Sequence, residues 1–113
     1  MGGGLFRGLF VAMLGGVMVL SLYPRLATPD VPAGSDKLAH FLMYFALAVP
    51  AALGWPARAR LVALALPLLG FGIELAQIPI PGRGFEWADA LANGLGAACG
   101  AVLASAAIRL ARR

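Results

Sequence analysis

The sequence is poor in charged residues and in cysteine. Only 12% of its 113 residues are charged, whereas 61% are hydrophobic. A soluble domain of this length has too little interior to bury so much apolar surface, so the composition argues against a soluble globular protein. The single cysteine, Cys99, cannot form an internal disulfide. The sequence therefore indicates one domain, covering residues 1–113, whose apolar side chains face lipid.

The excess of basic over acidic residues does not indicate a nucleic-acid partner. The formal net charge is +4, but the Arg residues flank the apolar runs and form no basic stripe of the kind that contacts phosphates. Basic residues at the ends of apolar runs orient a membrane protein instead. We therefore expect the lipid bilayer, and no nucleic acid, to surround this chain.

Four apolar runs of transmembrane length follow one another, at about 5–23, 38–55, 61–78 and 88–110. Crossing the hydrocarbon core takes about 20 residues. Lipid offers no partner to open backbone groups, so each run is predicted to be a helix. The predicted fold class is all-α, a polytopic membrane four-helix bundle. Ser35 is predicted to cap the second helix.

The distribution of charge predicts the orientation of the bundle. The side that holds both termini and the second connection has six basic residues and no acidic residue: Arg7, Arg58, Arg60, Arg109, Arg112 and Arg113. The opposite side has three basic residues among four acidic ones: Arg25, Lys37 and Arg83 with Asp30, Asp36, Glu86 and Asp89. Because cytoplasmic loops carry the excess of Lys and Arg, both termini are predicted to be cytoplasmic. Residues 24–37 and 79–89 are then outside.

Glu74 is the polar residue that most needs an explanation. A carboxylate inside a membrane span costs about 2.5–3.5 kcal/mol on insertion scales, and such residues usually face the protein interior or a wet cavity. Gln77 and Gly70 lie three residues after and four residues before Glu74, so all three share one helix face.

The second and fourth helices are predicted to bring polar side chains to the same outer third of the membrane. In the second helix the spacing of four places Asp36, His40 and Tyr44 on one stripe. In the fourth helix Asp89 and Asn93 share a face. The predicted polar pocket consists of Asp36, Lys37, His40, Tyr44, Glu74, Gln77, Arg83, Glu86, Asp89 and Asn93. Arg83 can pair with Glu86 or Asp89, or bind a phosphate or carboxylate.

The fourth helix has small residues at every fourth position: Ala92, Gly96, Gly100 and Ala104. Small residues at this spacing allow two helix backbones to approach closely. Tight packing within the bundle is the favoured interpretation, and a homo-oligomer interface is the alternative.

Several motifs resemble those of the VanZ-like family of bacterial membrane proteins. They are Ser35-Asp36-Lys37-Leu38-Ala39-His40-Phe41 with Tyr44, Glu74-x-x-Gln77, Pro81-Gly82-Arg83, Glu86-Trp87-x-Asp89 and Asn93-x-x-Gly96. They occur in the family's order between Asp36 and Gly100. The resemblance implies that these positions form the family's polar signature. It also implies a place in the bacterial inner membrane and the cell envelope, because the founding members are associated with teicoplanin resistance.

Three functional hypotheses follow for the predicted pocket. The first is a binding or accessory protein that holds a lipid head group or a cell-wall precursor. The second is an enzyme that acts on a lipid-linked phosphate with His40 or Glu74 as general base, although no nucleophile stands beside a base. The third is a small proton-coupled exporter, which the position of Glu74 in the third span and the charge bias disfavour. No cofactor is predicted, and no metal, because one His and two carboxylates lack short-range ligand spacing.

Overall fold

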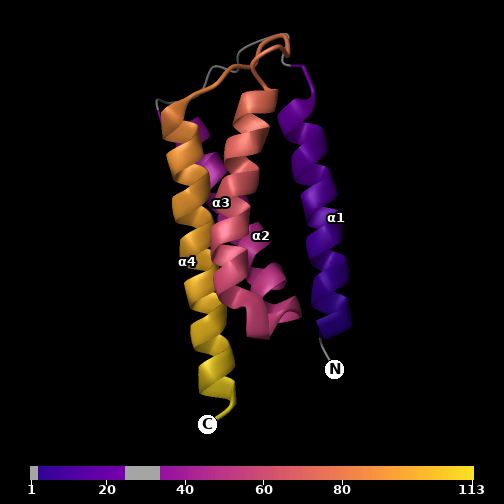
Figure 1. Cartoon of the computed structure of the whole chain (residues 1–113), viewed down its shortest axis with the longest axis vertical. Coiled ribbons are helices and arrows are strands. Elements are labelled where there is room, and N and C mark those ends of the chain that lie inside the picture. The colour runs from indigo at the N-terminus through magenta and orange to yellow at the C-terminus, as the bar shows by residue number, and fades with distance from the viewer. Residues whose placement is uncertain (1–2, 25–33) are drawn as a thin grey trace.

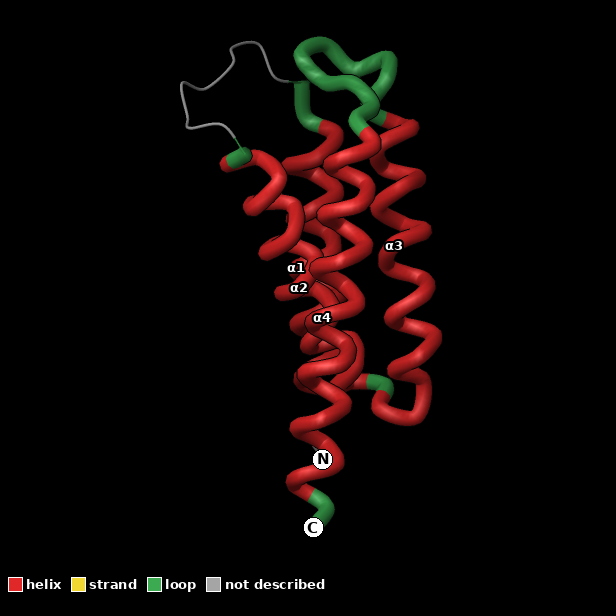
Figure 2. Tube along the Cα trace, turned by 90° about the vertical axis from the view of Figure 1, so that its left-hand side faces the viewer, coloured by secondary structure: helices red, strands yellow, loops and turns green. Residues whose placement is uncertain are grey.

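The computed structural model describes residues 3–24 and 34–113. Four long helices make up most of it: α1 (Gly3–Leu22), α2 (Ser35–Gly54), α3 (Ala59–Ala76) and α4 (Trp87–Ala111). A single 3₁₀ turn, η1 (Pro56–Arg58), joins α2 to α3 at the lower end of the bundle (Figure 2). Each long helix has the length and composition needed to cross a membrane. The predicted all-α fold is confirmed, and the chain is a multi-pass membrane protein.

The helices run alternately up and down, so α1 begins and α4 ends at the same end of the bundle (Figure 1). The molecule measures 49 × 24 × 22 Å. A helix of 20 residues is about 30 Å long, which matches the thickness of the hydrocarbon core. The six basic residues that flank the termini and η1 therefore lie at one end, and the polar residues of the predicted pocket lie near the other.

The start of α2 differs from the prediction. Gly34, with φ 85°, is the N-cap residue, and Ser35 is already the first helical residue, without a capping hydrogen bond from its side chain. The predicted cap at Ser35 is therefore wrong, because a glycine in the left-handed region makes the turn into the helix instead. The predicted loop residues Arg25 and Asp30 lie outside the described residues.

Close contact between α2 and α4 holds the centre of the bundle. A Cβ added to Gly96 would lie 2.1 Å from the carbonyl oxygen of Phe41, and one added to Gly100 would lie 2.6 Å from that of Phe45. The two backbones can touch only because these positions have no side chain. Tight packing within the bundle, the favoured interpretation of the small-residue stripe, is confirmed at these two positions.

Helix α1 is peripheral. Its middle packs on the core through Val17, with Phe10, Met13 and Leu14 beside it, and hydrogen bonds hold it near both ends. Val17 and Ser21 are its only buried residues among those described. At the lower end, Nε of Arg7 donates a hydrogen bond of 2.7 Å to the carbonyl oxygen of Gly54, and its guanidinium lies 5.1 Å from the ring centre of Trp55. The upper attachment involves residues of the predicted pocket.

The outer surface of the bundle is apolar, as lipid requires. Leu64 and Leu68 on α3 are 68% and 72% exposed. At the upper end, Trp87 is 72% exposed and its ring packs edge-on against Phe85, with centroids 4.9 Å apart. Aromatic residues at this level are typical of the boundary between lipid and water.

Candidate functional site

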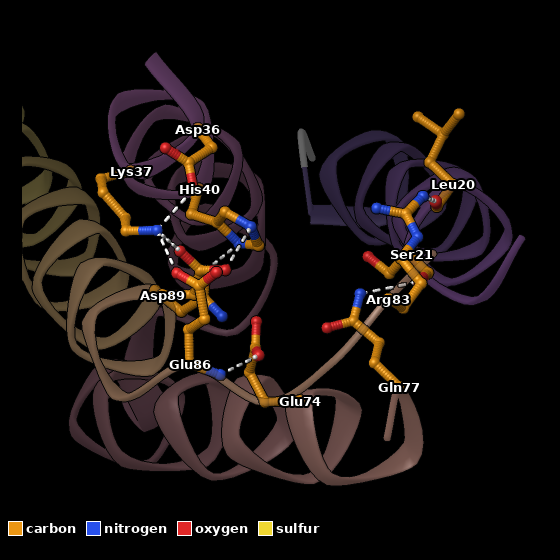
Figure 3. Close-up of polar contacts among 11 residues, drawn as sticks. Leu20, Ser21, Asp36, Lys37, His40, Glu74, Gln77, Arg83, Glu86 and Asp89 are labelled. Carbon is orange, nitrogen blue, oxygen red and sulfur yellow. Dashed lines mark hydrogen bonds and ion pairs between the residues drawn. The ribbon is translucent and has the colours of Figure 1, made fainter. Parts of the chain in front are cut away.

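Lys37 is the centre of an ion-pair cluster at the upper end of the bundle. Its ammonium group lies 2.5 Å from the carboxylate of Asp36 and 2.7 Å from Oδ1 of Asp89, and it also contacts the carboxylate of Glu86. The cluster joins the first turn of α2 to the start of α4 (Figure 3). Because one cation meets three carboxylates, Lys37 neutralises only part of the negative charge around it.

Glu74 lies inside the bundle, directly below this cluster. The residue is 1% exposed, and its Oε2 accepts a hydrogen bond of 3.2 Å from the backbone N–H of Glu86. Glu86 is the N-cap residue of α4, so the carboxylate of α3 satisfies a backbone donor at the start of another helix. The positive end of the α4 dipole favours an anion at this place. The other oxygen of Glu74, Oε1, has no hydrogen-bond partner among the described residues.

His40 stands between Asn93 and Asp89. Its Nδ1 lies 2.9 Å from Oδ1 of Asn93, and its Nε2 lies 3.5 Å from Oδ2 of Asp89. An amide oxygen can only accept, so Nδ1 is the donor in the first contact. Asn93 is 1% exposed, and it therefore fixes the orientation of the imidazole from inside the bundle.

Tyr44 and Gly70 close the site toward the centre of the membrane. Tyr44 is 1% exposed, and its hydroxyl has no hydrogen-bond partner within the described part of the chain. A Cβ added to Gly70 would lie 3.0 Å from Cβ of Asn93 and 3.1 Å from the ring of Tyr44. Glycine at this position therefore lets α3 approach α2 and α4 one turn below Glu74.

Gln77 and Arg83 face α1. Nε2 of Gln77 donates a 2.7 Å hydrogen bond to the carbonyl oxygen of Ser21. The guanidinium of Arg83 donates to the carbonyl oxygens of Leu20, at 2.6 Å, and of Tyr23, at 3.1 Å. These carbonyls belong to the last turn of α1 and the residue that follows it, where helical acceptors lack internal partners. The two residues thus form the upper attachment of α1.

A cavity separates the two groups of polar side chains (Figure 3). Its volume is about 90 Å³, and its lining includes Asp36, His40, Glu86 and Asp89 on one side and Gln77 and Arg83 on the other. A second cavity of about 240 Å³, between α1 and α2, shares Asp36, His40, Gln77 and Arg83 with the first. Its lining also contains the apolar side chains of Leu20, Ala39 and Met43.

The structure places most of the predicted pocket residues in one group. Asp36, Lys37, His40, Glu74, Glu86, Asp89 and Asn93 are linked by hydrogen bonds or ion pairs, or lie within reach of one another. Tyr44 lies below them, whereas Gln77 and Arg83 are on the opposite wall of the cavity. The contribution of α1 could not be predicted from the sequence, because the groups that it supplies are backbone carbonyls, which every residue type has.

The chain matches one protein family over nearly its whole length. A family model for VanZ/LLP1 matches residues 11–109, nearly the whole chain. The chain belongs to the VanZ/LLP1 family. The family membership inferred from the sequence motifs is therefore confirmed. No curated protein and no solved structure matches this VanZ/LLP1 chain.

Proposed function

We propose that this VanZ/LLP1 protein binds the head group of a lipid-linked cell-envelope component on the outer side of the bacterial cytoplasmic membrane. Both termini are then cytoplasmic. The charge distribution supports this orientation, because the end that holds the termini and η1 has six Arg residues and no acidic residue.

One observation carries the proposal: polar side chains from three helices converge inside a membrane bundle that otherwise has an apolar surface. His40, Glu74 and Asp89 each offer an atom within 4.8 Å of the others. Polar groups inside a membrane protein are costly unless they pair with one another, and where they are retained they mark functional sites. Glu74 retains an oxygen without a hydrogen-bond partner in the described chain, so mutual satisfaction does not account for the whole group.

The shape of the site supports a lipid-linked ligand. The larger cavity lies between α1 and α2 and combines polar residues with Leu20 and Met43, so that a head group and the first part of its apolar chain can be bound together. Hydroxyl or amine groups of the head group would donate to Asp36 and Glu86. A phosphate would lie nearer Arg83, whose guanidinium has the geometry to bind it.

Lipids that co-purify with the protein provide the test. The protein would be purified in native-membrane nanodiscs, and its lipids would be compared by mass spectrometry with those of the surrounding membrane. A polyprenyl-phosphate-linked component should be enriched with the wild type and reduced at least tenfold with the double variant Asp36→Asn/Glu86→Gln. The control is Ser105→Ala, which lies near the other end of α4. If the bound lipids of all three proteins match the bulk membrane, the proposal is wrong.

A cellular readout comes from the family's association with teicoplanin resistance. Expression of the wild type should raise teicoplanin tolerance of a susceptible host, and His40→Ala or Glu74→Gln should abolish the increase without loss of membrane insertion. Equal tolerance with wild type and both variants would contradict a role of the site in the envelope.

A further inference from the structure

We infer that His40, Glu74 and Asp89 form a binding site for one divalent transition-metal cation. The residues come from α2, α3 and α4, and one ligand-type atom from each lies within 4.8 Å of the other two. The sequence alone disfavours a metal site, because no two of these residues are near neighbours in the chain. In the fold, α3 runs antiparallel to α2 and α4 and packs beside them, so the three residues lie at the same level.

Glu74 gives the independent indication that a ligand belongs here. Its carboxylate is buried and is directed toward His40 and Asp89 (Figure 3). Oε2 is held by the backbone N–H of Glu86, which leaves Oε1 buried with no hydrogen-bond partner among the residues described. A buried carboxylate oxygen is costly to leave unpaired, and coordination to a cation would satisfy it.

His40 is oriented as a metal ligand would be. Its Nδ1 donates to the amide oxygen of Asn93, so in the neutral ring Nε2 presents a lone pair toward Asp89. Metal-bound histidines commonly donate their other ring N–H to a protein oxygen in this way. The distance of 3.5 Å from Nε2 to Oδ2 of Asp89 is long for a hydrogen bond. Two ligands of a tetrahedral zinc ion, each about 2.1 Å from the metal, lie about 3.4 Å apart.

The local charge matches one divalent cation. Four carboxylates surround the smaller cavity or contact its walls, from Asp36, Glu74, Glu86 and Asp89. Among the described residues around this cavity, the cationic side chains are Lys37 and Arg83. Four negative and two positive charges leave a formal charge of −2 when His40 is neutral. One divalent cation would cancel this charge.

A second group of possible ligands, Asp36, Glu86 and Asp89, already has a cation. Lys37 contacts all three carboxylates. Asp89 takes part in both groups, with Oδ1 toward Lys37 and Oδ2 toward His40. Lys37 thus partly neutralises the outer group, which consists of Asp36, Glu86 and Asp89. The metal is assigned to the inner group, which consists of His40, Glu74 and Asp89.

The donor atoms determine which cation is expected. One imidazole nitrogen and two carboxylates suit zinc and manganese better than magnesium or calcium, and affinity for such a site should be higher for Zn²⁺ than for Mn²⁺. Three protein ligands leave a coordination position for water or another oxygen. If the proposed function holds, on which this last step rests, the phosphate beside Arg83 would place one oxygen in that position from across the small cavity.

Equilibrium binding of Zn²⁺ and Mn²⁺ to the purified full-length protein tests the assignment. The protein would carry a tag without histidine and be stripped with a chelator and freed of added lipid. We expect one Zn²⁺ per chain by elemental analysis, and weaker Mn²⁺ binding by electron paramagnetic resonance. Glu74→Gln and His40→Ala should each weaken Zn²⁺ binding at least tenfold. Ser105→Ala, near the other end of α4, should retain wild-type binding, and Glu86→Gln, which removes a charge beside the site, should weaken binding less than Glu74→Gln does.

The outcomes separate the alternatives. Absence of Zn²⁺ binding by a wild type that is monodisperse and helical overturns the inference, as does unchanged binding by Glu74→Gln and His40→Ala. Loss in Glu86→Gln but not in Glu74→Gln assigns the metal to the outer group and also overturns it. A rise in wild-type melting temperature with Zn²⁺ that is absent from Glu74→Gln supports it even if that variant folds less stably. Lipid co-purification would be measured separately, with and without chelator. Failure of the proposed lipid binding can then be distinguished from failure of the proposed metal site.

Discussion

His40 is held by Asn93, and this single hydrogen bond determines which ring nitrogen faces the carboxylates. Replacing Asn93 with Ala removes a buried partner and leaves Nδ1 of His40 without its acceptor. Hydrogen bonds between membrane helices contribute about 0.6 kcal/mol on average and up to about 1.7 kcal/mol. We expect Asn93→Ala to lower the free energy of unfolding in detergent by about 1 kcal/mol.

Equilibrium unfolding with increasing SDS, followed by circular dichroism, measures this loss. Leu91→Ala is the control, because Leu91 is on the same helix but 64% exposed. An effect of Asn93→Ala no larger than that of Leu91→Ala would show that the hydrogen bond contributes nothing to stability.

Lys37 contacts the carboxylates of Asp36, Glu86 and Asp89, so its ammonium group occupies the place that another cation would need. Lys37→Met removes the ammonium group and leaves Asp36, Glu86 and Asp89 close together, with ligand-type atoms within 4.8 Å of one another. Because an oxygen-only group suits Ca²⁺, millimolar Ca²⁺ should raise the melting temperature of the variant and not that of the wild type. Equal responses to Ca²⁺ in both proteins would contradict the role assigned to Lys37.

At the scale of helices, α4 provides a matched pair of glycines that tests the packing against α2. An added Cβ at Gly96 meets the Phe41 carbonyl oxygen at 2.1 Å, whereas one at Gly94 meets Cβ of Pro67 at 3.6 Å, an ordinary contact. Gly96→Ala must therefore push α2 and α4 apart. Overpacking of this kind typically costs about 1–3 kcal/mol.

The SDS unfolding assay distinguishes the two substitutions. We expect Gly96→Ala to destabilise the bundle by this amount and Gly94→Ala to change stability by less than about 0.5 kcal/mol. Similar losses for both would mean that the close approach of α2 and α4 does not contribute to stability.

The sequence predicts the helices well, and their mutual contacts less completely. Hydropathy identifies four spans because lipid requires continuous apolar helices, and spacing places His40 and Asp89 on inward faces. The direction of Gln77 and Arg83 toward α1 could not be predicted in this way, because their acceptors are carbonyl oxygens of Ser21, Leu20 and Tyr23. Nor could spacing show that Lys37, on the edge of the stripe, contacts three carboxylates.

At the scale of the whole molecule, the charge asymmetry predicts the topology. In a Cys99→Ala background, a cysteine at position 57, beside η1, should be protected from a membrane-impermeant maleimide in intact cells. A cysteine at position 84, between α3 and α4, should be labelled. Permeabilised cells provide the control, since both positions are exposed and should then react. Labelling of position 57 but not of position 84 in intact cells would reverse the proposed orientation.

The unequal attachment of the four helices also determines how the larger cavity can change in width. The wall formed by α2 is fixed to α4 by backbone contact at Gly96 and Gly100, so it cannot retreat without breaking the centre of the bundle. The facing wall, α1, buries only Val17 and Ser21 among its described residues. A few apolar side chains in its middle pack on the core, and hydrogen bonds hold it near its two ends. A bulky ligand would therefore be admitted by outward bending of α1, and the cost of that motion depends on the upper bonds from Gln77 and Arg83.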